Sequence, residues 1–109
     1  MAYLYLAIAI VFEVAGTVTL KATEGFSKII PSLIVILCYI VSIYLVSLTI
    51  KTLPVGVAYA IWTGTGLCFV VLISAFVYRQ FPDVPAILGM TFIIMGVSII
   101  QIYSKMINN

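Results

Sequence analysis

The chain has 109 residues, of which 65% are hydrophobic and 7% charged, and its net charge is +2. Soluble domains carry about 25% charged residues, so the composition excludes a water-soluble fold and makes the bilayer the expected solvent. No basic run is present that would bind nucleic acid. There is no histidine beside the two separated cysteines, which argues against a metal site.

Four apolar runs follow one another along the chain, at residues 3–20, 30–50, 57–77 and 85–104. Each is close to the roughly 20 residues that an α-helix needs to cross the hydrocarbon core. The breaks between them are short, so consecutive helices are predicted to be antiparallel. The sequence therefore predicts an all-α fold, with residues 1–109 forming a single integral membrane domain of four transmembrane helices.

Prolines and one capping residue mark where two of these helices begin. Pro31 fits the first turn of the second helix, where a missing N–H costs little. Asp83 is predicted to cap the fourth helix, with Pro85 as its first residue.

The first run contains a single charged residue, Glu13, near its middle. A charge at the bilayer centre costs roughly 2.5–3.5 kcal/mol on insertion scales, and no lysine or arginine lies inside the other runs to pair with it. Burial disfavours the charged form, so this carboxylate is expected to hold either a proton or a cation. Because the two compete for one group, Glu13 is predicted to bind both proton and substrate and to couple their movements.

Small and polar residues share the helix face of Glu13. Ala9, Gly16 and Thr17 lie three or four residues from it, which places them on the same side of a helix. Ala9 and Gly16 are small and leave room for another helix or a ligand. These three residues are predicted to line the substrate site.

Aromatic residues in the second and third runs could complete such a site. Tyr59 and Trp62 are three residues apart, so they share a face on which their rings could hold an organic cation. Tyr39 and Ser42 share a face of the second helix in the same way. An interfacial aromatic belt remains an alternative for Tyr59 and Trp62, whereas Tyr39 lies in mid-span.

Two pairs of glycines have different expected roles. Gly64 and Gly66 weaken the third helix and are predicted to mark a kink or hinge. Gly89 and Gly96 are seven residues apart and recur on one stripe of the fourth helix. Small residues let membrane helices approach closely, so this stripe is predicted to be a dimer interface.

The charges do little to fix the direction of insertion. With four spans, Lys51 and Lys105 lie on one side, and Lys21, Lys28 and Arg79 on the other. Two against three is not the clear excess on which the positive-inside rule depends, although it could be an accident of counting. Transporters often obtain two-sided access from inverted repeats, and four helices are too few for a pair. Two copies inserted in opposite directions would supply it, which predicts an antiparallel homodimer.

Three segments together are similar to those of a known family. They are FEVAGTVTLKATEGF around Glu13, LPVGVAYAIWTGTG in the third run, and PAILGM followed by Gly96 in the fourth. On these segments the chain resembles the small multidrug resistance family along essentially its whole length. The resemblance implies an antiparallel dimer in a bacterial inner membrane that exchanges protons for aromatic cations and quaternary ammonium compounds. It implies neither a cofactor nor an enzymatic reaction.

The family's functional residues fall on positions already named. The essential carboxylate falls on Glu13, the substrate-lining aromatics on Tyr39, Tyr59 and Trp62, the kink on Gly64 and Gly66, and the dimer contacts on the Gly89–Gly96 face.

The subtype rests on two of these positions. The family's guanidinium exporters usually carry Trp where this chain has Gly16, and they usually lack the tyrosine found here as Tyr39. Both residues therefore favour the drug-exporting subtype. Guanidinium export stays open as an alternative, as does a role as one half of a heterodimeric paralogue pair. A membrane subunit that does not transport would leave Glu13 unexplained.

In the third loop, Phe81 replaces a basic residue that is typical of the family, and Arg79 lies earlier.

Overall fold

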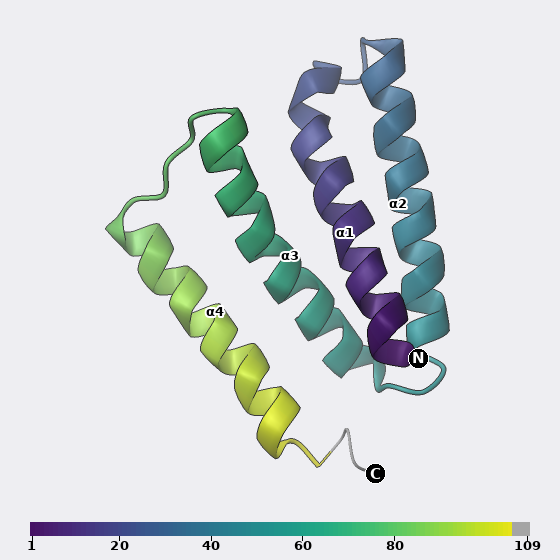
Figure 1. The fold of residues 1–109 in the computed structure, drawn as a ribbon, viewed down its shortest axis with the longest axis vertical. Coiled ribbons are helices and arrows are strands. Elements are labelled where there is room, and N and C mark those ends of the chain that lie inside the picture. The colour runs from purple at the N-terminus through teal and green to yellow at the C-terminus, as the bar shows by residue number, and fades with distance from the viewer. Residues whose placement is uncertain (106–109) are drawn as a thin grey trace.

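The computed structural model describes residues 1–105, in which four long helices follow the four apolar runs (Figure 1). The helices are α1 (Ala2–Leu20), α2 (Ile29–Thr49), α3 (Val55–Val77) and α4 (Val84–Tyr103), with a short 3-10 helix, η1 (Lys21–Thr23), directly after α1. Each of the four is long and apolar enough to cross a membrane. The predicted all-α fold with four spans is confirmed, and the chain is a multi-pass membrane protein.

A tight turn reverses the chain between α1 and α2. Glu24, Gly25 and Phe26 all have positive φ angles, of 47°, 72° and 63°, a conformation in which only the glycine avoids a steric cost. Thr23 is buried and holds the turn, because its Oγ1 donates to the Leu20 carbonyl at 2.7 Å and accepts from the Phe26 N–H at 3.2 Å. The two helices are thereby made antiparallel neighbours.

The features predicted for the starts of α2 and α4 agree with the structure to within a residue. The Asp83 side chain caps α4 by accepting a hydrogen bond from the Ala86 N–H at 3.1 Å. The helix begins at Val84, so Pro85 is its second residue, one position later than predicted. Pro31 lies in the first turn of α2, as expected.

The helices lie side by side in one layer, in the order α2, α1, α3, α4 (Figure 1). The layer measures 46 × 34 × 17 Å. Its main core lies where α1 crosses α3, and there the buried residues of the two helices are Leu6, Ile10, Val14, Val57, Ala58 and Ile61. Because α1 packs against both α2 and α3, it is the helix on which the rest of the layer is assembled.

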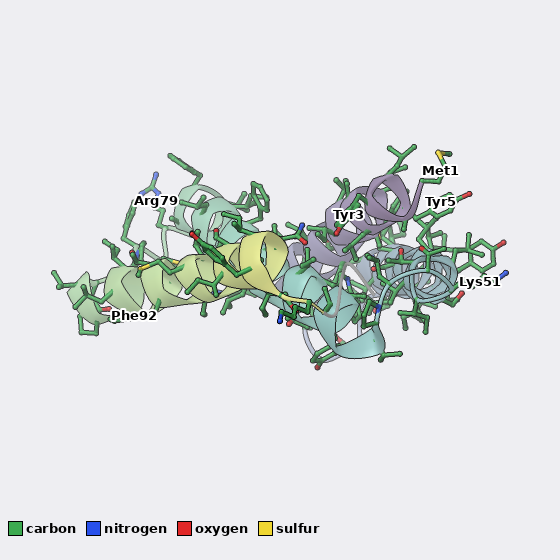
Figure 2. All side chains as sticks on the ribbon, turned by 90° about the horizontal axis from the view of Figure 1, so that it is seen from below. Met1, Tyr3, Tyr5, Lys51, Arg79 and Phe92 are labelled. Atoms are coloured by element: carbon green, nitrogen blue, oxygen red, sulfur yellow. The ribbon has the colours of Figure 1, made fainter. Side chains whose placement is uncertain are left out.

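The fourth helix stands at the edge of the layer and packs against α3. It contributes no buried residue. Figure 2 shows Phe92 projecting from this edge, at the opposite end of the layer from Lys51. The apolar surface of α4 is therefore free to meet lipid or another protein.

Candidate functional site

Glu13 lies at the centre of α1 and is half-buried. Its Oε1 accepts a hydrogen bond of 2.9 Å from the hydroxyl of Thr17, one helical turn further on. Within residues 1–105 the only salt bridge joins Lys28 to Glu24, on the surface. The carboxylate therefore has a neutral hydrogen-bond donor, and no basic side chain within these residues pairs with it.

Tyr39 extends this polar contact from α2. Its hydroxyl lies 2.7 Å from the Thr17 hydroxyl. A threonine has one O–H to donate, and here it is directed to Glu13, so Tyr39 must donate to Thr17. The result is a chain of two hydrogen bonds, from Tyr39 to Thr17 and from Thr17 to Glu13, which orients donors toward a charged carboxylate. Sequence reasoning placed Thr17 on the Glu13 face but did not anticipate this link.

Gly16 allows the Tyr39 ring to lie against α1. A Cβ atom at Gly16 would lie 3.0 Å from Tyr39 Cε1 and 3.2 Å from Cys38 Cβ. Such distances are tighter than ordinary van der Waals contact, which begins at 3.4 Å. In the single chain the space that Gly16 leaves open is thus taken by the tyrosine.

Gly66 brings the backbone of α3 against the carboxylate. A Cβ atom at this buried position would lie 2.7 Å from Glu13 Oε2, so a side chain here would displace the carboxylate from its present position. The sequence suggested only a hinge for Gly66, and this contact was missed because it depends on how α1 and α3 align. The helix is continuous through both glycines, and the hinge role stays a prediction.

Gly64 faces a different neighbour. A Cβ atom here would lie 2.9 Å from Val97 Cγ2 and 3.1 Å from Ile93 Cγ2, both on α4. This glycine lets α4 approach α3, a role that the sequence did not suggest.

Tyr59 and Trp62 share the α3 face that carries Gly66, since the three residues follow one another at spacings of three and four. Their rings make an edge contact, with centroids 5.9 Å apart and planes at 71°. Tyr59 is 59% exposed, whereas Trp62 packs against the core between α1 and α3. The Trp62 Nε1 is buried and has no hydrogen-bond partner in the described part of the chain. An aromatic pair with an exposed ring therefore lies on the face of α3 that meets Glu13 of α1.

Ala9 and Ser42 lie buried in the contact between α1 and α2. Both are fully buried, and the Ser42 hydroxyl donates to the Ala9 carbonyl at 2.7 Å across the α1–α2 contact. The bond satisfies a polar group inside the helix pair. Contact of these two residues with substrate stays a prediction.

Gly89 and Gly96 lie on the free surface of α4. A Cβ atom at either position would meet nothing within 4 Å. The stripe is therefore open in the single chain, as a surface that meets a second molecule must be.

Comparison with known proteins gives one consistent result. The family model for the Small Multidrug Resistance protein matches residues 1–93. The chain is 50% identical to the multidrug transporter PA4990 of Pseudomonas aeruginosa, 44% to the multidrug transporter EmrE of Escherichia coli, and 43% to the quaternary ammonium compound-resistance protein QacE of Escherichia coli. Each similarity extends over 103 residues, which is 94% of this chain and 94% of the relative.

Proposed function

The chain belongs to the small multidrug resistance family, and from that premise we propose that it exports hydrophobic and quaternary ammonium cations in exchange for protons. The proposal rests above all on Glu13, a carboxylate in a membrane span that no basic side chain among residues 1–105 neutralises. Its relatives are described as multidrug transporters and as a quaternary ammonium compound-resistance protein.

The exchange follows from competition for one group. An unpaired carboxylate in a low-dielectric span is stable when it holds a proton or when a cation lies beside it. Arrival of a cation therefore favours loss of the proton, and arrival of a proton favours release of the cation. The Thr17 hydroxyl supports the charged state by donating to the carboxylate, and the Tyr39 hydroxyl lies behind it as the donor to Thr17.

The aromatic residues give the site its preference for organic cations. Tyr59 offers an exposed ring beside Trp62, and aromatic faces attract cations within about 6 Å of the ring centre. A hydrophobic or aromatic cation would thus gain contact with the rings while its charge is balanced by Glu13. A small, strongly hydrated cation would gain less.

A second copy of opposite orientation is part of the proposal. The chain exposes 7132 Å², whereas a compact soluble monomer of its mass would expose about 5,900 Å². The chain is a flat layer whose edge helix, α4, buries none of its residues. The open stripe at Gly89 and Gly96 on this helix is the surface on which we place contact between the two copies, because small residues favour close helix packing in membranes.

Purified protein in proteoliposomes provides the test. Addition of a tetraalkylammonium ion should release protons from the protein, and an imposed pH gradient should drive uptake of this ion into the vesicles. Guanidinium should give a much smaller response in both assays. Glu13→Gln should abolish both cation binding and proton release, while Glu13→Asp should weaken exchange through its shorter reach. Robust proton-coupled transport by the Gln variant would refute the mechanism, and a stronger response to guanidinium than to tetraalkylammonium would assign the chain to guanidinium export.

A further inference from the structure

An apolar groove runs between α1 and α3, along the side of α1 that points away from Glu13. It encloses about 610 Å³, and its walls include Val11, Ala15 and Val18 of α1 and Thr65, Phe69 and Ile73 of α3. Val11 and Ala15 are each two residues from Glu13, so they point to the opposite side of the helix. The lining includes neither Glu13 nor its hydrogen-bond partners, although on α3 Phe69 and Ile73 follow Gly66 by three and seven residues and so share the face that meets the carboxylate.

The groove has the length of one leaflet of the bilayer. Along α1 it extends from Ala7 to Thr19, which is about 18 Å at 1.5 Å per residue. Half of a hydrocarbon core of about 30 Å is close to that value. A single acyl chain lying parallel to the helices would fit the groove along its length.

Two cationic side chains stand at the end where the groove meets the membrane surface. Lys21 directly follows α1, and its Nζ lies 5.0 Å from the centre of the Tyr78 ring. The Tyr78 hydroxyl donates to the Val18 carbonyl at 2.5 Å, joining the end of α3 to a residue of the groove wall. Arg79 is next in sequence, and Figure 2 shows its side chain projecting outward from the layer.

The acidic residues near this end are already engaged. Glu24 pairs with Lys28 at 3.5 Å, and Asp83 caps α4. Lys21 and Arg79 are both exposed and form no salt bridge within residues 1–105. The end of the groove therefore carries positive charge that a bound anion would neutralise.

We propose that this groove is a binding site for an anionic phospholipid, with one acyl chain between α1 and α3 and the phosphate beside Lys21 and Arg79. Basic residues at the ends of membrane helices attract anionic headgroups by about 1 kcal/mol each. The lipid would belong to the leaflet that meets the first and third loops. The proposal stands apart from transport and does not depend on it.

The test is photolabelling in phosphatidylcholine nanodiscs that contain a phosphatidylglycerol with a diazirine in its acyl chain. Labels mapped by mass spectrometry should concentrate on residues 11–19 and 69–73, and they should saturate as the anionic lipid is increased. A phosphatidylcholine with the same diazirine should label these residues weakly and without saturation.

Variants separate the headgroup from the groove. Lys21→Gln and Arg79→Gln should each raise the amount of anionic lipid needed for half-maximal labelling about fivefold, the change that about 1 kcal/mol makes. Lys51→Gln and Lys105→Gln, which remove the same charge on the other side of the membrane, should leave it unchanged. Val11→Phe should fill the groove and reduce labelling, whereas Ile40→Phe on the exposed face of α2 should not.

Three results would overturn the proposal. They are equal labelling by the two lipids, unchanged half-saturation in the Lys21 and Arg79 variants, and disulfide cross-linking of Val11→Cys between two copies in place of lipid labelling. A circular dichroism spectrum and an elution volume like those of the wild type exclude misfolding as the cause of any loss.

Discussion

The contact between Gly66 and Glu13 leads to a sharp prediction for Gly66→Ala. The new Cβ would lie 2.7 Å from Glu13 Oε2, and ordinary contact begins at 3.4 Å, so the carboxylate must retreat by 0.7 Å. That movement opposes the 2.9 Å hydrogen bond from Thr17. Hydrogen bonds to charged groups contribute about 1.5–3 kcal/mol, so loss of about 1.5 kcal/mol should weaken binding of tetraphenylphosphonium roughly tenfold.

Stability should change less than affinity. Alanine is favoured over glycine inside a helix by about 1 kcal/mol, which offsets most of the lost hydrogen bond, so Gly66→Ala should unfold close to the wild-type temperature. The loss would then be specific to the site. Equilibrium affinity, measured by isothermal titration calorimetry, is the decisive quantity because it does not depend on how fast a hinge moves.

Two other glycines of α3 serve as matched controls. A Cβ at Gly64 would press on Val97 and Ile93 of α4, and one at Gly56 would meet nothing within 4 Å. Both alanine variants should bind the cation within about twofold of wild type. If the hinge prediction for Gly64 is right, Gly64→Ala should slow transport while keeping its affinity. Wild-type affinity in a folded Gly66→Ala variant would refute the account of the carboxylate contact.

Three further predictions concern the hydrogen-bond chain, the orientation and the tryptophan. Tyr39→Phe keeps the ring on Gly16 but removes the donor to Thr17, a bond worth about 0.5–1.5 kcal/mol, so calorimetry should show a two- to tenfold loss of affinity; no loss would mean that the chain does not support the carboxylate. Adding two lysines to the loop at residues 51–54 should fix one orientation, and adding them to the loop at residues 79–82 the other. Each form alone should lose drug resistance in cells and the two together should regain it, whereas full resistance from one form would contradict the antiparallel dimer. Tetraphenylphosphonium should quench Trp62 fluorescence saturably; saturable quenching that is unchanged in Glu13→Gln would separate the tryptophan from the site.

Much of the fold was determined by local properties of the sequence. Every backbone group in hydrocarbon must be hydrogen-bonded, which only helices and closed β-barrels achieve, and runs of about 20 residues have the length of a spanning helix. The Asp83 cap likewise depends on neighbours in sequence. Glu13 stood out for the same kind of reason, because a charge in an apolar span is costly wherever the helix is placed.

The arrangement around Glu13 was decided by the tertiary structure. Helix periodicity placed Thr17 on the carboxylate face and Tyr39 in the middle of α2, but their hydrogen bond depends on the register between two helices, which no local pattern fixes. The same holds for Gly66, whose missing side chain matters only because α3 crosses α1 at the carboxylate. Ser42 shared a face with Tyr39 in the sequence, yet packing turned its hydroxyl to the Ala9 carbonyl. Periodicity gives the direction of each side chain about its own helix axis, whereas the neighbour that it meets depends on how the helices rotate and slide to pack.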